Sequence, residues 1–216
     1  MRTTALQNLL VGGGKTASST CFDPGSLGRG AIQNPPLQAA HACDNPAFKC
    51  YQIHSIPYLG GVANPMLYVW ASHEELRSFR WDPGTRTFGA VATNSMLAGY
   101  PGGMLAVSSQ AGAAGTSILW AVDTNGVVRA YDAFNVANEI WNSSQIANDA
   151  LGKFSKFGQP VVADGTLFVP TFSNTVVAYG LLPQSPASGS GQPAPAPAPE
   201  PTPAPAPTPN PGDPAC

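Results

Sequence analysis

Short apolar runs alternate with polar turn residues along most of the chain, and the clearest example is the segment ILWAVDTNGVVRAYD, residues 118–132. Ile118 to Val122 is rich in β-branched and aromatic residues, which is typical of a strand, and Val127 to Tyr131 has the same character. Between them lies Asn125-Gly126, a pair that strongly favours a tight hairpin because glycine adopts a positive φ without a Cβ clash. The segment therefore predicts an antiparallel hairpin with a primed turn.

The spacing of this hairpin recurs along the chain. In four places a leucine is followed twelve positions later by an aromatic residue, and a small residue stands directly before the aromatic. The four pairs are Leu10 and Phe22, Leu67 and Phe79, Leu119 and Tyr131, and Leu167 and Tyr179. Their starting points lie 48 to 57 positions apart, which is close to the length of a propeller blade.

Further apolar runs flank these hairpins and supply a first and a fourth strand. They are Ile56–Leu59, Met104–Ser108 and Gln159–Ala163 ahead of a hairpin, and Phe88–Val91 and Glu139–Asn142 behind one. One four-stranded repeat cannot bury both of its faces alone, so neighbouring repeats must stack. Residues 1–182 thus predict an all-β fold, a partial β-propeller of about four blade-like, four-stranded antiparallel repeats.

The composition changes at Pro183. Thirteen of the 23 prolines fall in residues 183–216, mostly in alternation with alanine between Pro193 and Pro207. Proline fixes φ and lacks a backbone donor, so this part predicts a disordered, extended linker with polyproline II character. Such a linker is typical of a tether between a domain and a wall, a membrane or another domain.

The repeat resembles that of a known family. Residues 125–132, continuing to Glu139-Ile140-Trp141, resemble the repeat of the pyrroloquinoline-quinone (PQQ)-type β-propellers. Residues 156–182 resemble the closing blade of bacterial proteins of that kind, and the segment from Gly12 to Pro24 resembles an earlier, degraded copy. The resemblance covers roughly residues 8 to 182 and implies a propeller. It also makes PQQ and calcium candidate cofactors, although many such repeats carry no quinone.

The last repeat ends after its third strand, Tyr179 to Leu182. In a propeller the missing strand comes from upstream, so we expect earlier blades and a signal peptide to precede Met1 in the intact protein. That protein would be extracytoplasmic, either periplasmic or secreted. A complete four-bladed ring is the alternative.

Charge excludes some classes of partner. Charged residues make up 10% of the chain and hydrophobic residues 43%, with a formal net charge of −2. Nothing in this balance favours nucleic acid or an anionic membrane surface. No apolar run approaches the ~20 residues of a membrane helix, so no membrane span is predicted.

Two cysteines lie in a long irregular segment, Asp23 to Tyr51. Cys43 and Cys50 are a candidate disulfide, as expected for an extracytoplasmic β protein. With His41 and His54 they also form H-x-C-x6-C-x3-H, a conceivable zinc site. That spacing matches no common zinc finger, so the disulfide is the favoured interpretation.

The remaining two cysteines have no obvious partner. Cys21 occupies the small position before the aromatic of its repeat and is interpreted as a buried, inert thiol. Cys216 is either a tail cysteine or the first cysteine of a haem-attachment motif that continues beyond it. His54 is interpreted as a strand histidine and His73 as a solvated turn residue.

The sequence contains no recognisable catalytic constellation. Asp82, Asp123 and Asp164 stand in turn sequences, and Glu74 and Glu75 are adjacent, so on a strand they point to opposite faces. The glycine run 12–14 lacks the first glycine and the following helix of a phosphate-binding loop. Four tryptophans are expected to fill space between blades, and one of them is a candidate floor for a planar cofactor. They are Trp70, Trp81, Trp120 and Trp141.

Two functions remain open from sequence. The favoured one is a non-catalytic extracytoplasmic β-propeller module for binding or scaffolding, held on the proline-rich linker. Its partner would be a protein, a cell-wall component or a small molecule. The alternative is a C-terminal fragment of a PQQ-dependent oxidoreductase that passes electrons to a c-type haem domain beyond residue 216. Such dehydrogenases commonly carry a vicinal disulfide beside the quinone, and adjacent cysteines do not occur here.

Overall fold

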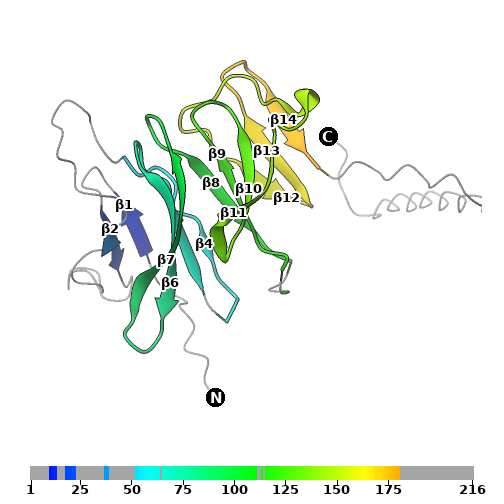
Figure 1. The fold of residues 1–216 in the computed structure, drawn as a ribbon. Helices are drawn as coiled ribbons and strands as arrows, with labels where there is room; N and C mark the ends of the chain where they lie inside the picture. The colour runs from blue at the N-terminus through cyan, green and yellow to red at the C-terminus, as the bar shows by residue number, and fades with distance from the viewer. Residues whose placement is uncertain are drawn as a thin grey trace, which may run out of the picture. The chain divides into compact units, whose positions relative to one another are not determined.

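The structure is a computed structural model (Figure 1). It describes residues 52–180, except 64, 111, 112 and 114, together with three short strands nearer the N-terminus, at 10–13, 18–22 and 37–38. Contacts divide the chain into two units, Met1–Leu181 and Leu182–Cys216. The predicted linker, residues 183–216, lies outside the described residues.

The described strands form four antiparallel sheets, each built from strands consecutive in sequence. The first is β1–β2–β3, with bounds Leu10–Gly13, Ser18–Phe22 and Leu37–Gln38. The second is β4–β5–β6–β7, with bounds Tyr58–Leu59, Met66–Val69, Glu75–Asp82 and Thr87–Leu97. The third is β8–β9–β10–β11, with bounds Met104–Ser108, Ile118–Val122, Val128–Asp132 and Asn135–Asn142. The fourth is β12–β13–β14, with bounds Val161–Ala163, Thr166–Pro170 and Val176–Tyr179.

The all-β fold of blade-like antiparallel repeats is thus confirmed, with differences in detail. The first and fourth sheets have three strands in the part of the chain that the structure describes, not four. Strand β3 lies within the Asp23–Tyr51 segment, for which the sequence predicts irregular structure. One turn of 3-10 helix, η2 (Ala147–Asp149), joins the third sheet to the fourth. In the described ranges no helix is long and apolar enough to cross a membrane.

The leucine–aromatic spacing has a simple structural meaning, because the two residues of each pair are cross-strand partners. The register places opposite each other Leu10 and Phe22, Leu67 and Phe79, Leu119 and Tyr131, and Leu167 and Tyr179. A spacing of twelve is therefore the length of two paired strand segments and the turn between them. The same hairpin is built four times.

The turn of the β9–β10 hairpin differs from the primed turn predicted at Asn125-Gly126. Gly126 has φ of +82°, whereas Asn125 has no positive φ. The Gly126 N–H donates to the Asp123 carbonyl (3.0 Å), and the Asp123 N–H donates to the Val127 carbonyl (3.0 Å). The connection is thus a wider turn closed by one left-handed glycine, and the prediction of a primed turn at Asn125-Gly126 is wrong.

A two-residue turn with both φ angles positive occurs instead at Asp164-Gly165, with φ of +47° and +73°. It joins the paired residues Ala163 and Thr166 at the ends of β12 and β13. This is the primed geometry that matches the twist of a tight hairpin.

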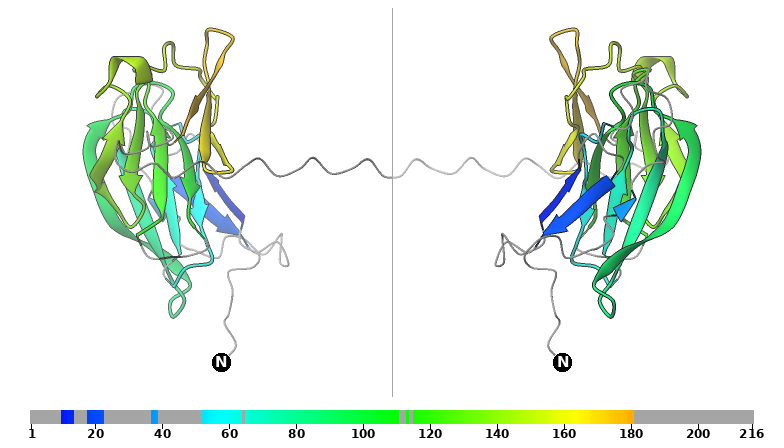
Figure 2. Two further views of the ribbon diagram at one scale, coloured as in Figure 1. Left: turned by 90° about the vertical axis from the view of Figure 1, so that its right-hand side faces the viewer. Right: turned by 90° about the vertical axis from the view of Figure 1, so that its left-hand side faces the viewer.

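Successive sheets stack on one another (Figures 1 and 2), and their facing sides bury three apolar layers. The first layer joins Val11 of β1 to second-sheet residues that include Leu67, Val69, Phe79 and Trp81. The second joins Met66, Tyr68 and Trp70 of the second sheet to Leu105, Leu119 and Tyr131 of the third. The third joins Met104, Val122 and Val128 of the third sheet to Leu167 and Val169 of the fourth. Each sheet therefore stacks on the one before it in sequence.

The segments that lead into β4 and β12 meet at β8, the first strand of the third sheet. The Ser55 hydroxyl donates to the Leu105 carbonyl (2.9 Å) and accepts from the Leu105 N–H (3.0 Å). The Gln159 side-chain amide donates to the His54 carbonyl (3.0 Å), although these residues are 105 positions apart. The first strands of the second, third and fourth sheets, β4, β8 and β12, therefore lie near one another. The last strands of the second and third sheets, β7 and β11, are accordingly the outer edges of those sheets.

Candidate functional site

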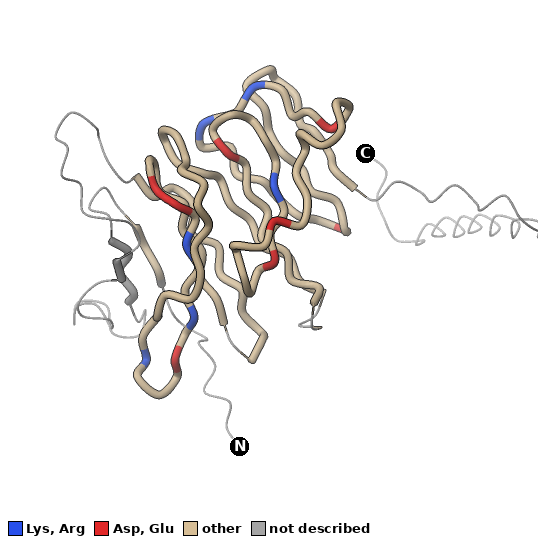
Figure 3. The backbone as a smooth tube through the Cα atoms, viewed as in Figure 1, with Lys and Arg blue, Asp and Glu red and all other residues tan. Residues whose placement is uncertain are grey.

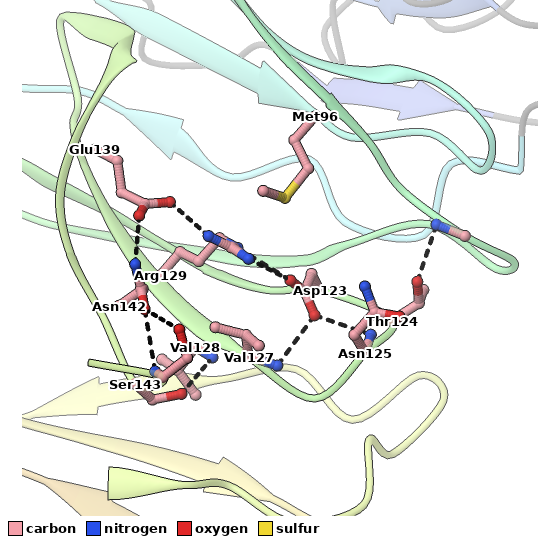
Figure 4. Close-up of polar contacts among 12 residues, drawn as sticks. Met96, Asp123, Thr124, Asn125, Val127, Val128, Arg129, Glu139, Asn142 and Ser143 are labelled. Atoms are coloured by element: carbon pink, nitrogen blue, oxygen red, sulfur yellow. Dashed lines mark hydrogen bonds and ion pairs between the residues drawn. The ribbon is translucent and has the colours of Figure 1, made fainter. Parts of the chain in front are cut away.

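A cluster of charged residues links the β9–β10 turn to the outer strand β11 (Figure 4). Arg129, near the start of β10, donates from Nε to Asp123 Oδ2 (3.0 Å) and from Nη1 to Glu139 Oε2 (2.7 Å). Its Nη2 is also 3.0 Å from Asp123 Oδ2. Because β10 is paired on both sides, the guanidinium lies between a turn on one side and an edge strand on the other.

The Asp123 carboxylate has no free hydrogen-bonding edge. Its side chain is 3% exposed, and Oδ1 accepts from the backbone N–H groups of Asn125 (2.9 Å) and Val127 (3.0 Å). Burial alone would lower the pKa of Arg129, but hydrogen bonds and charges from Glu139 and Asp123 outweigh it and raise that pKa. The guanidinium therefore stays charged and holds the turn, and Asp123 is not placed to act as a base.

Beside this cluster, an open hollow of about 440 Å³ lies between the outer strands β7 and β11. Its walls combine hydroxyl, amide, thioether, phenol, methyl and carboxylate groups. The lining residues are Thr93, Asn94, Ser95, Met96, Tyr131, Ala137 and Glu139. None of these is a lysine or an arginine. The volume lies within the range of small-molecule sites.

Irregular pairing accompanies the hollow on both sides. The register of β10 with β11 shifts on each side of Tyr131, between Ala130 and Tyr131 and between Tyr131 and Asp132. The register of β6 with β7 shifts between Ser78 and Phe79. Bulges of this kind bend the strand that carries them and occur often beside functional sites. They explain why two outer strands of stacked sheets leave space between them.

Tyr131 contributes a buried hydroxyl that has no hydrogen bond of good geometry. The residue is 1% exposed, and its Oη has no partner within strict hydrogen-bonding geometry, although looser side-chain hydrogen bonds with Asn94 and Glu139 contribute to its pKa. Burial is the main cause that raises the pKa of Tyr131 to about 12. The hydroxyls of Tyr68 and Tyr179, by contrast, donate to the carbonyls of Ala133 (2.7 Å) and Asp149 (2.9 Å). An unsatisfied buried hydroxyl is costly and calls for an explanation.

The turn aspartates carry out the role predicted for them. Asp82 Oδ1 accepts from the N–H of Gly84 (2.8 Å), and this bond is the main cause that lowers the pKa of Asp82. Asp132 Oδ1 accepts from the N–H of Phe134 (2.8 Å), as expected of a residue that caps the next turn. These carboxylates therefore fix backbone conformation.

The tryptophans pack inside the sheet layers. Trp70 is 2% exposed, and its indole N–H donates to the Glu74 carbonyl (3.1 Å). Trp81 lies edge-on to Phe88, and the indole N–H of Trp120 donates to the Ser108 hydroxyl (2.9 Å). The fourth, Trp141, lies edge-on to Tyr179.

The described residues do not fit PQQ with calcium. Among them no group of three His, Cys, Asp or Glu could hold a metal ion. The aspartate of the cluster, Asp123, already binds Arg129 and two backbone amides.

The cysteine predictions lie outside the described residues. Cys43, Cys50 and Cys216 are not described, nor is the side chain of Cys21. His54 is described, and its interpretation as a strand histidine is wrong: it precedes β4, is exposed, and lies edge-on to Phe157. The segment that contains His54 is not a strand. It is held by the hydrogen bonds of Ser55 to Leu105 and of Gln159 to the His54 carbonyl. His73 is an exposed turn residue with φ of +61°.

Fold and hollow together define an all-β protein of antiparallel sheets stacked in sequence order, with a candidate ligand site between two outer strands. Comparison with protein-family models and with curated protein sequences finds no match to this chain.

Proposed function

We propose that this chain is a non-catalytic binding module, and that the hollow between β7 and β11 binds a small, uncharged ligand rich in hydroxyl groups. The observation that carries the proposal is the buried, unsatisfied Tyr131 hydroxyl in the wall of an open hollow. Because this hydroxyl is buried, a ligand oxygen would reach it when the side chains that line the hollow shift, and it would then remove the cost of leaving the hydroxyl unpaired.

The chemistry of the walls supports the class of ligand. Thr93, Asn94 and Ser95 provide neutral donors and acceptors, whereas Met96 and Tyr131 provide apolar contact. The carboxylate of Glu139 is already matched by Arg129 (2.7 Å) and by the Asn142 side-chain amide (2.6 Å). An anion would find no lysine or arginine in the lining, and a cation would have to compete with Arg129. A sugar-like molecule meets neither obstacle.

Two features support a binding role on a tether. The ionised groups of the cluster are bonded to one another or to the backbone, so they hold structure and are not poised for proton transfer. The proline-rich sequence of residues 183–216 is typical of a spacer. An extracytoplasmic location remains part of the proposal.

The test is a ¹H–¹⁵N NMR titration of the whole chain with neutral monosaccharides (glucose, galactose and mannose), and with glucuronate and glucosamine as charged counterparts. We expect shifts confined to residues 93–96 and 131–139 with at least one neutral sugar, and weaker binding of its charged counterpart. The variant Tyr131→Phe should bind about tenfold more weakly, since one hydrogen bond to a buried group is lost.

Tyr179→Phe is the matched control, because it removes a hydroxyl on β14, away from the hollow, that donates to the Asp149 backbone carbonyl. It should leave binding unchanged. Absence of shifts with every neutral sugar at high millimolar concentration would overturn the proposal, and so would equal binding by the Tyr131→Phe variant.

A further inference from the structure

The fourth sheet has one buried face and one exposed, apolar face. Val161, Phe168 and Val176 are 56%, 38% and 65% exposed. They join into one patch, because Val161 and Ala178 both pair with Phe168, on β12 and β14 respectively, and Val176 pairs with Pro170. The three strands carry no Lys, Arg, Asp or Glu (Figure 3). An apolar sheet face of this kind is unusual on a monomer surface.

This exposed face corresponds, position by position, to faces that are buried elsewhere in the chain. The residue directly after each repeat leucine packs on the next sheet: Val11 on the second, Tyr68 on the third and Trp120 on the fourth. Phe168 follows Leu167 in the same way, and it is exposed. The patch therefore continues the pattern of an interface that the chain already makes three times.

The surface that receives such a face is also defined by the repeat. In each of the three layers, the receiving surface belongs to the later of the two sheets and carries that sheet's repeat leucine. These leucines are Leu67, Leu119 and Leu167. The β1–β2 hairpin holds Leu10 opposite Phe22, at the same register positions. By register, Leu10 therefore stands in the first sheet where Leu67, Leu119 and Leu167 stand in the later sheets.

We propose that the exposed face of β12–β14 stacks on the β1–β2 hairpin of a second copy of this chain. The contact is head-to-tail, and two such contacts related by a two-fold axis close into a dimer. The inference is independent of the ligand assigned to the hollow, because no patch residue lines it.

The test is sedimentation of the whole chain at 1 to 100 µM, with Phe168→Lys, Leu10→Lys and Ile140→Lys variants. Ile140 is the control because it is 54% exposed but lies on the outer strand β11, away from the patch. We expect the mass of two copies for the wild type and for Ile140→Lys, and of one copy for the other two variants. Circular dichroism should show that Phe168→Lys stays folded, since its side chain is already exposed.

A mixture of the Phe168→Lys and Leu10→Lys proteins gives the sharpest result. In a head-to-tail pair one interface remains free of lysine, so the mixture should regain a two-copy mass. If the wild type sediments with the mass of one copy at every concentration, the proposal is overturned. That outcome includes the case in which the chain covers its own patch. A dimer insensitive to Phe168→Lys, or sensitive to it but not to Leu10→Lys, would overturn it as well.

Discussion

At the scale of single residues, the main feature is the unequal environment of the charges around Arg129. Asp123 is almost fully buried and depends on Arg129 and two backbone amides. Glu139 is partly exposed and has a second partner in Asn142. Losing the arginine therefore leaves a buried carboxylate without its countercharge, whereas losing the glutamate charge leaves an arginine that is still paired.

This asymmetry predicts different costs for two substitutions. Arg129→Met should lower the free energy of unfolding by about 2–4 kcal/mol, because a buried ion pair is broken on one side. Glu139→Gln should lower it by less than about 1 kcal/mol, as is usual for exposed pairs. Urea unfolding at neutral pH measures both changes, and equal losses would contradict the description of the cluster.

At the scale of elements, turns determine where each hairpin folds back. Gly126 and Gly165 both have positive φ, at +82° and +73°. A Cβ added at Gly126 would lie 2.6 Å from the Gly152 carbonyl oxygen, while one at Gly165 would meet nothing within 4 Å. The first glycine is required by close packing and by conformation, and the second by conformation alone.

The two glycines thus form a matched pair of tests. Gly165→Ala should cost about 1 kcal/mol, since only left-handed strain is added. Gly126→Ala should cost about 2–4 kcal/mol, because the loop that carries Gly152 must also move. Thermal or urea unfolding gives both values, and a smaller loss for Gly126→Ala than for Gly165→Ala would refute the close approach.

At the scale of the whole molecule, stability comes from layers shared between sheets. The third sheet is covered on both faces, through Leu119 on one side and Val128 on the other. The fourth sheet is buried, in the described chain, through Leu167 and its neighbours on one face only. Stacked repeats of this type gain most of their stability from contacts with neighbours.

Two core truncations should therefore differ in how far their effect spreads. Leu167→Ala and Leu119→Ala should each cost about 2–5 kcal/mol. Hydrogen exchange should show lost protection confined to residues 161–179 for Leu167→Ala, but spread over the second and third sheets for Leu119→Ala. The same wide loss in both variants would mean that the fourth sheet does not unfold separately.

The local pattern of the sequence determined the hairpins and their order. Alternating apolar runs, turn residues and the leucine–aromatic spacing act over about fifteen residues, and strand pairing within a hairpin depends on little else. For that reason the amino-acid pattern alone predicts the strands and the equivalence of Leu119 and Tyr131 with the other leucine–aromatic pairs. The same logic fails at Asn125, because the carboxylate of Asp123 accepts from the N–H groups of Asn125 and Val127 and so stabilises a wider turn.

Only the tertiary structure decided the site. The hollow exists because strands β7 and β11, some forty residues apart, are both bulged and lie on neighbouring sheets. Tyr131 can be recognised in the sequence as a repeat aromatic, with a phenol where Phe22 and Phe79 have none, but not as a hydroxyl without a partner. Satisfaction of a buried polar group depends on atoms brought close by packing between sheets, and short-range sequence patterns do not specify those distances.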